Sequence, residues 1–153
     1  MAGIKLDLSG FTEMLKNVEK AQGDVDAAAS RAVNECANIV EAELKAQASA
    51  KKVPSSITSS IRKSVEVNAD VYSAKVGWTL DSYDPRNPSA GYKAIFLNYG
   101  TVRRQTRAGK NRGAIEKPTK SGQFIYAAKK SAATKCKNAK RNIIDTVMRD
   151  LKK

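Results

Sequence analysis

A stripe of small apolar residues over about seven helical turns is the sequence feature that most limits how this chain can fold. It recurs at steps of three and four through residues 24–50, which is the spacing of one helix face. The stripe consists of Val25, Ala29, Ala32, Cys36, Val40, Leu44 and Ala48. The spacing predicts one long helix over 24–50. Because alanine dominates the stripe, this helix can pack closely against a sheet or a second helix.

Alternating apolar and polar residues predict strands on both sides of this helix. The pattern is present at residues 4–8 and again at 61–68 and 71–78, which we expect to form a hairpin. A short apolar run at 94–99 predicts a further, buried strand. The chain is therefore expected to form one α+β domain over residues 1–153, in which a small, mostly antiparallel sheet of three or four strands packs on the long helix.

A second long helix is predicted at the end of the chain, over about 122–151. Its apolar positions also recur at steps of three and four, and many of the positions between them are lysines. The final helix is expected to lie alongside the domain or to project to a neighbour. In the core, we expect Cys36 and Leu44 to be buried together with Phe96 and Leu97.

The positive charge of the chain is confined to its last third. Residues 1–100 contain 12 Lys and Arg and 12 Asp and Glu, whereas residues 101–153 contain 16 and 3, so the net charge of +13 lies entirely in the second segment. Residues 103–120 combine seven cations with two glycines and a proline that interrupt helices. This composition predicts a basic loop that is mobile in the free protein.

The cations of this loop are the candidate contact residues. They are Arg103, Arg104, Arg107, Lys110, Arg112, Lys117 and Lys120. Their side chains could contact the phosphates of a nucleic acid without reading its sequence, or pair with carboxylates across a subunit interface. The alternative is a solvated cationic surface with no partner. We favour docking to an acidic partner, because the first 100 residues carry no net charge.

The residue types needed for catalysis or metal binding are scarce. The chain has no histidine, which removes the commonest general base and metal ligand, and two cysteines are too few for a thiolate zinc site. Cys36 and Cys136 lie on apolar helical positions, which indicates small buried residues, with a redox pair as the alternative. The segment 109–113 lacks the ending of a phosphate-binding loop. We therefore expect no enzyme activity, no metal and no cofactor.

The sequence also gives no indication of a membrane partner. No apolar run approaches the ~20 residues of a membrane-spanning helix, and the first residues lack the apolar stretch of a signal peptide. The apolar stripe of the final helix is mostly alanine and lacks the large anchors of helices that lie on membranes. We expect synthesis in the cytosol.

Three short stretches lie in an order and spacing that resemble a known family. Residues 58–65 are similar to a family stretch that reads Thr-Gly, any residue, Leu-Arg, any residue, Ser-Ile. Residues 94–101 resemble an apolar segment that closes with an acidic residue, an aromatic residue and Gly-Thr, and residues 123–127 resemble the start of the family's last helix. Over nearly its whole length the chain thus resembles the tailed-phage head–tail joining or tail-completion family, the gene-product-ten-like neck proteins of siphophages and prophages. Ser59 and Asn98 depart from the family's usual glycine and glutamate.

This resemblance implies a structural virion protein rather than an enzyme. It implies self-assembly into a ring, with a hexamer as the candidate size, that joins or completes head and tail around the path of the DNA. Neighbouring neck and tail proteins would be its partners, together with nonspecific contact to the passing DNA, and the protein would move from the host cytoplasm into the virion. The alternative function is that of a small basic protein that binds nucleic acid without sequence preference.

Overall fold

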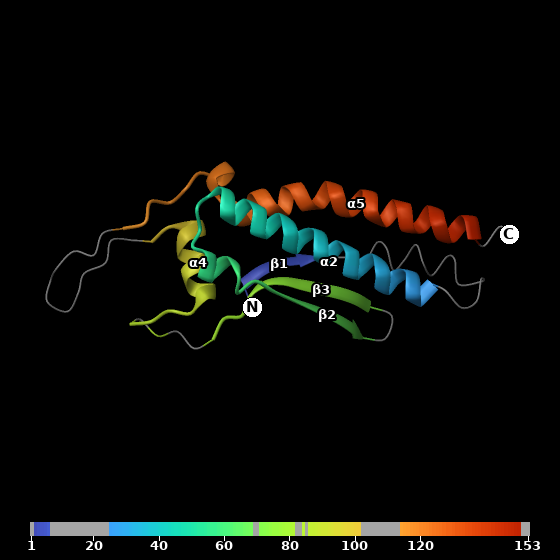
Figure 1. Cartoon of the computed structure of the whole chain (residues 1–153), viewed down its shortest axis with the longest axis horizontal. Helices are drawn as coiled ribbons and strands as arrows, with labels where there is room; N and C mark the ends of the chain where they lie inside the picture. The colour runs from blue at the N-terminus through green and yellow to red at the C-terminus, as the bar shows by residue number, and fades with distance from the viewer. Residues whose placement is uncertain are drawn as a thin grey trace, which may run out of the picture.

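The computed structural model describes residues 2–6, 25–68, 71–81, 84, 86–101 and 114–150. In Figure 1, one long helix lies between a second long helix and a small sheet. The elements are β1 (Ala2–Leu6), α2 (Val25–Ala50), α3 (Ser55–Thr58), β2 (Arg62–Asn68), β3 (Val71–Trp78), α4 (Ala90–Tyr99), the 3-10 helix η1 (Lys120–Gly122) and α5 (Phe124–Asp150). The predicted α+β class with a long final helix is confirmed.

The central helix α2 covers almost the range that its apolar stripe predicts. The stripe is fully buried from Ala29 to Ala48, because α2 packs against both α5 and the sheet. The helix ends in a Schellman motif, in which Lys52 has a φ of 55° and the N–H of Val53 donates to the carbonyl of Ala48 at 3.0 Å. Val53 then packs on the core and fixes the direction in which the chain leaves the helix.

The strand β3 lies at the centre of the sheet. It pairs antiparallel with β2, as the predicted hairpin requires, and antiparallel with β1 on its other side, where Ile4 faces Val76. On β3 the alternate residues Ala74, Val76 and Trp78 are buried and belong to the same core as α2. The first strand was expected at 4–8 but lies at Ala2–Leu6, and the residues that follow it are outside the described part of the chain.

The strand predicted at 94–99 is wrong, because these residues belong to the helix α4. A run of four apolar residues fits a buried strand as well as a helix, and periodicity cannot separate the two. The helix buries only one narrow side, through Gly91, Ala94 and Asn98. It crosses the end of the domain, against β3 and α3, rather than extending the sheet (Figure 1). Phe96 therefore stacks on Tyr92 one turn earlier, with ring centroids 6.5 Å apart.

The helices α2 and α5 run antiparallel to each other (Figure 1). Many of the buried side chains at their contact are small. At this contact, the thiol of Cys36 on α2 lies 3.8 Å from the carbonyl oxygen of Cys136 on α5. The thiol of Cys136 lies 3.7 Å from the carbonyl oxygen of Cys36. Alanines continue the contact along α5 on both sides of this pair: Ala128, Ala132 and Ala139. Side chains of this size let the two backbones approach closely around the cysteine pair.

Part of the predicted core composition is confirmed. Cys36 and Leu44 are fully buried, but Phe96 and Leu97 are only partly buried, because α4 exposes one side to solvent. The large buried rings are instead those of Trp78 and Phe124, which meet edge to face at 6.1 Å. The indole N–H of Trp78 donates to the carbonyl of Ile57 at 2.8 Å, so this buried polar group is satisfied.

Candidate assembly site

The structure describes two of the seven predicted contact residues. Lys117 and Lys120 are exposed and lie between the end of α4 and the start of α5. No ion pair joins either lysine to a carboxylate within the described residues. The other five lie outside the described residues, so their predicted roles and the predicted mobility there stay predictions: Arg103, Arg104, Arg107, Lys110 and Arg112.

The two ends of the basic segment are held together by hydrogen bonds. The N–H of Thr101 donates to the carbonyl of Ile115 at 2.9 Å, and the N–H of Ile115 donates to the hydroxyl of Thr101 at 3.1 Å. Beside this pair, Gly100 has a φ of 78° and a ψ of 176°, a region that essentially only glycine adopts. A Cβ atom at Gly100 would lie 2.7 Å from the Cα of Lys117. The residues that lead into the loop and out of it are thus fixed to each other.

A buried asparagine joins α4 to the start of α5. The side-chain oxygen of Asn98, which is fully buried, accepts a hydrogen bond from the backbone N–H of Ile125 at 2.9 Å. This N–H belongs to the first turn of α5, where backbone donors have no partner within the helix. The asparagine therefore serves as an N-cap supplied by another element. The Nδ2 atom of Asn98 has no hydrogen-bond partner among the described atoms.

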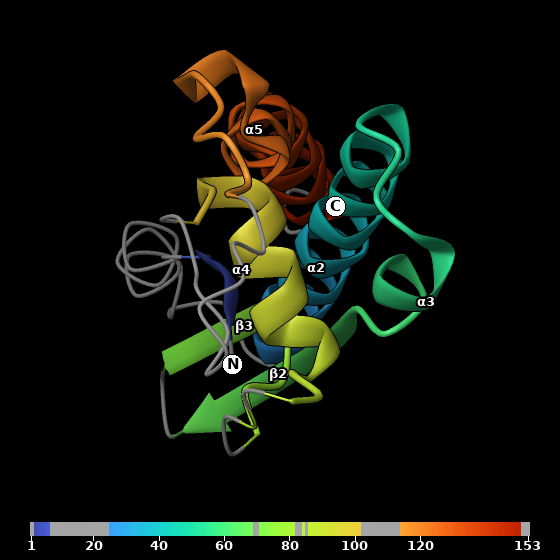
Figure 2. The same ribbon diagram turned by 90° about the vertical axis from the view of Figure 1, so that its left-hand side faces the viewer.

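Three large apolar side chains are exposed around this junction. Tyr99 is 49% exposed, Ile115 is 40% exposed and Tyr126 is 47% exposed. Their backbones are brought together because Tyr99 follows Asn98, Tyr126 follows Ile125, and Ile115 is bonded to Thr101. Figure 2 looks onto this end of the domain, with α4 in front and α5 behind. Together with Lys117 and Lys120, these side chains form what we call the candidate face.

Sequence reasoning found the two lysines of the candidate face but missed its apolar residues. The sequence predicts Tyr99 as part of a buried strand. Ile115 lies in the segment 103–120, whose predicted role rests on its cations and helix-interrupting residues. No local pattern places Tyr99, Ile115 and Tyr126 near one another, because hydrogen bonds between distant residues create that arrangement. Residues 103–120 contain no aromatic residue, whereas Tyr99 and Tyr126 lie on either side of them in the sequence.

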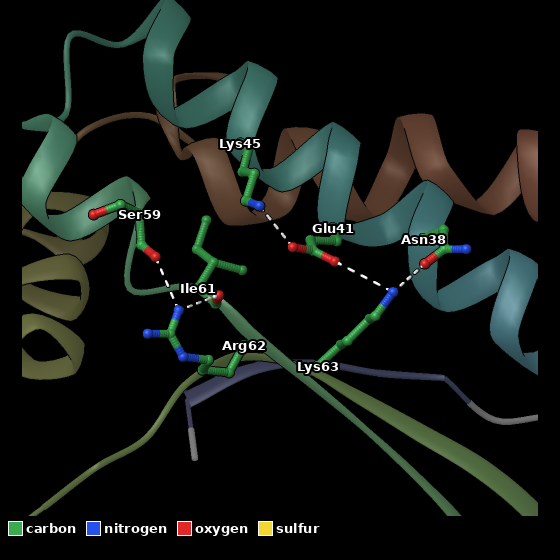
Figure 3. A network of polar contacts seen from close by, with 7 residues as sticks. All are labelled: Asn38, Glu41, Lys45, Ser59, Ile61, Arg62 and Lys63. Carbon is green, nitrogen blue, oxygen red and sulfur yellow. Dashed lines mark hydrogen bonds and ion pairs between the residues drawn. The ribbon is translucent and has the colours of Figure 1, made fainter.

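Most described acidic residues of the first 100 are already bound within the subunit. In Figure 3, Glu41 accepts from Lys45 at 2.6 Å and lies 3.8 Å from Lys63, which also donates to Asn38. The hydrogen bond from Lys45 holds the pKa of Glu41 below its ordinary value. This network joins α2 to β2.

A second ion pair joins α2 to α5. Lys135 pairs with Glu43, and the pKa of that glutamate is lowered by its hydrogen bonds from Lys135 and Ser131. A third pair, between Lys75 and Glu66 at 2.8 Å, lies across the hairpin. Each of these carboxylates already pairs with a lysine of the same subunit.

The cysteines have the properties of structural residues. Both are buried and free. The hydrogen bond between them and burial raise the pKa of the Cys36 thiol, whereas the same hydrogen bond lowers the pKa of Cys136. A buried thiol such as Cys36, which stays protonated, is a poor nucleophile and a poor metal ligand. The described residues contain no group of three or more potential metal ligands, and none of the described helices is long and apolar enough to cross a bilayer.

Comparison with protein families identifies the group to which this architecture belongs. Residues 12–100 match the family model described as "Bacteriophage HK97-gp10, putative tail-component". The chain belongs to the HK97-gp10-like family. The resemblance drawn from the short sequence stretches is thereby confirmed at the level of a bacteriophage tail component. Membership of a phage tail-component family implies a virion location and contact with other phage proteins.

The matched region includes α2, the hairpin and α4, and it ends at Gly100. The basic segment and α5, which carry the net charge, follow the matched residues. No curated protein and no solved structure matches the chain. The last third of this HK97-gp10-like protein therefore lies outside the region that the family model describes.

Proposed function

We propose that this chain is a non-enzymatic subunit of the phage neck, which assembles into a ring that joins head and tail around the DNA path. The family match supports a tail component. The observation that carries the more specific proposal is the candidate face, where three large apolar side chains and two lysines without a described carboxylate partner gather at one end of the domain. Aromatic residues in such a position are typical anchors of protein interfaces.

A ring requires two different surfaces on each subunit, because each copy contacts the next in a head-to-tail manner. The candidate face supplies one surface. It differs from the opposite end of the domain, where the described large apolar residues that are exposed are Val71, near the β2–β3 hairpin turn, and Met148, near the end of α5. We propose that the candidate face docks on a non-equivalent surface of the neighbouring subunit or of a neck partner.

The five arginines and lysines of residues 103–112 extend the same proposal. They follow Thr101, which is part of the fixed base of the basic segment. Arginine can engage a carboxylate with two parallel hydrogen bonds, so these residues suit an acidic partner. A triple substitution of Arg103, Arg104 and Arg107 by glutamate should leave the circular dichroism spectrum unchanged and prevent assembly. Normal assembly with an isolated loss of DNA binding would contradict this role.

The assembly state in solution tests the proposal directly. The double variant Ile115→Asp/Tyr126→Asp places two charges on exposed positions of the candidate face and should yield monomers in size-exclusion chromatography with light scattering, where the wild type yields oligomers. The control is Val71→Asp, since Val71 is 61% exposed at the other end of the domain. It should assemble like the wild type. Equal assembly of the two variants, or a monomeric wild type at high concentration, would contradict the proposal.

A further inference from the structure

The outer surface of α5 carries a row of cations that the folded subunit does not use. An α-helix turns by about 100° per residue, so Lys129, Lys130, Lys137, Lys140 and Arg141 fall within one arc of about 120° on α5, beside the alanine stripe that contacts α2. Lys140 is the member of the row near the buried cysteine pair. All are exposed except Lys140, which is intermediate. We call this row the basic face of α5. None of its members forms an ion pair within the described residues, whereas Lys135, which lies on a different side of α5, is paired with Glu43.

From this arrangement we propose that the basic face of α5 binds the phosphate backbone of duplex DNA without sequence preference. The row extends over about 18 Å of helix, at 1.5 Å per residue. Over that length duplex DNA presents about ten phosphates, at one charge per ~1.7 Å. The phosphates along that length therefore outnumber the five cations of the row.

An acidic surface of a second copy is a poorer partner for this face. Seven of the 12 acids in residues 1–100 have described side chains, and five of these already accept a hydrogen bond or ion pair: Asp26, Glu41, Glu43, Glu66 and Asp84. Over the described part of the whole chain, the acids that remain without such a partner are Glu35, Asp81, Glu116 and Asp145, fewer than the five cations of the row. The cores of protein interfaces are also depleted in lysine and rich in aromatic residues, whereas four of the five residues in the row are lysines.

The fold also argues against insertion of α5 into a membrane and against base recognition. Most of the apolar stripe of α5 is buried on α2. The large apolar side chains that the described part of α5 exposes, Tyr126 and Met148, lie near its two ends and do not form the continuous apolar side of a helix that lies on a membrane. Lysine contacts phosphate oxygens as a point charge, and such contacts carry no sequence information. The described residues of the row therefore fit binding to the backbone alone.

Fluorescence anisotropy with a labelled random-sequence duplex of 25 base pairs tests the proposal. The logarithm of the binding constant should fall with the logarithm of salt concentration at a slope of about −4 to −5 if all five cations contact phosphates. The triple variant Lys130→Gln/Lys137→Gln/Arg141→Gln should bind at least tenfold more weakly in 100 mM salt. Its slope should be shallower by about three, because each lost phosphate contact removes about one.

The control removes the same charges elsewhere on the described surface. The triple variant Arg31→Gln/Lys51→Gln/Lys93→Gln also loses one arginine and two lysines, all of them exposed. It should retain the affinity within about twofold and the slope of the wild type. Cations of the basic segment are present in all three proteins and cannot produce a difference between the two variants.

Light scattering on the same samples separates this proposal from ring formation. The α5 variant should lose DNA affinity and keep the oligomeric state of the wild type. A wild type that does not bind the duplex in 50 mM salt, or equal losses in the two triple variants, would overturn the proposal. An α5 variant that keeps DNA binding but loses assembly would show instead that this face contacts an acidic protein.

Discussion

The α2–α5 interface and the candidate face use their residues in opposite ways. Between α2 and α5, small side chains are fully buried along the facing stripes, and the two cysteines meet near the centre. Around the end of α4, a few hydrogen bonds hold the backbone in place, and large apolar side chains stay exposed. The first region is complete within one subunit. The second has a fixed backbone and an unburied surface, which is the combination expected of a docking site.

The largest loss of stability is expected in the first region. The Leu44→Ala variant removes a fully buried side chain from the core and should lower the free energy of unfolding by about 2–5 kcal/mol. Urea unfolding followed by circular dichroism measures this change. A loss below about 0.5 kcal/mol would indicate that the apolar stripe of α2 faces solvent in the subunit and serves as an assembly surface.

At the base of the basic segment, the Gly100→Ala variant should cost about 1–3 kcal/mol. The backbone of Gly100 has a φ that side chains disfavour, and the new Cβ would come within 2.8 Å of the carbonyl oxygen of Ile115. Because the candidate face and the α2–α5 interface are separate regions, the loss of stability in this variant should stay confined to the base of the basic segment. Amide hydrogen exchange should become faster at Thr101 and Ile115 but stay slow at the centre of α2. Fast exchange in α2 as well would show that the two regions are not separate.

The Asn98→Leu variant removes the cap of α5 and should cost about 0.5–2 kcal/mol, as the loss of an N-cap does. Its matched control is Asn98→Asp, which keeps an oxygen for the N–H of Ile125 and places a negative charge at the positive end of the helix. The aspartate variant should be more stable than the leucine variant. The reverse order in urea unfolding would exclude the capping role.

The smallest effect is expected from the ion pair between α2 and α5. The folded-state pKa of Glu43 is below its ordinary value, so the stabilisation is present above the unfolded-state pKa of about 4.3 and is lost as the pH falls through the folded-state value. Because Lys135 is largely exposed, the Glu43→Gln variant should lose at most about 1 kcal/mol at pH 7. The difference from the wild type should disappear in acid. A difference that persists at about pH 3 would show that Glu43 stabilises the fold by other means.

The sequence was most informative where one pattern repeats along a whole element. The alanine-rich stripe of residues 24–50 predicts α2 because each of its turns repeats the same signal, and the two strands of the hairpin alternate clearly. The four apolar residues from Ala94 to Leu97 give too short a signal, and a helix was mistaken for a strand. Their true environment depends on β3 and α3, which lie far away in the sequence.

The candidate face could be predicted only in part, for a related reason. Lys117 and Lys120 are visible in the sequence as members of a charge cluster. Asn98 and Ile125 are 27 residues apart, and Thr101 and Ile115 are 14 residues apart. No periodicity connects such pairs, so the gathering of exposed side chains at one end emerges only when the chain is folded.

Electron microscopy of the purified protein tests the central claim most directly. If the candidate face is a docking surface for ring assembly, negatively stained wild-type protein should show closed rings of uniform diameter, and the Ile115→Asp/Tyr126→Asp variant should show only single subunits. Two results would contradict the account. One is single subunits in both samples, even when the wild-type protein is highly concentrated. The other is rings of the same kind in both samples.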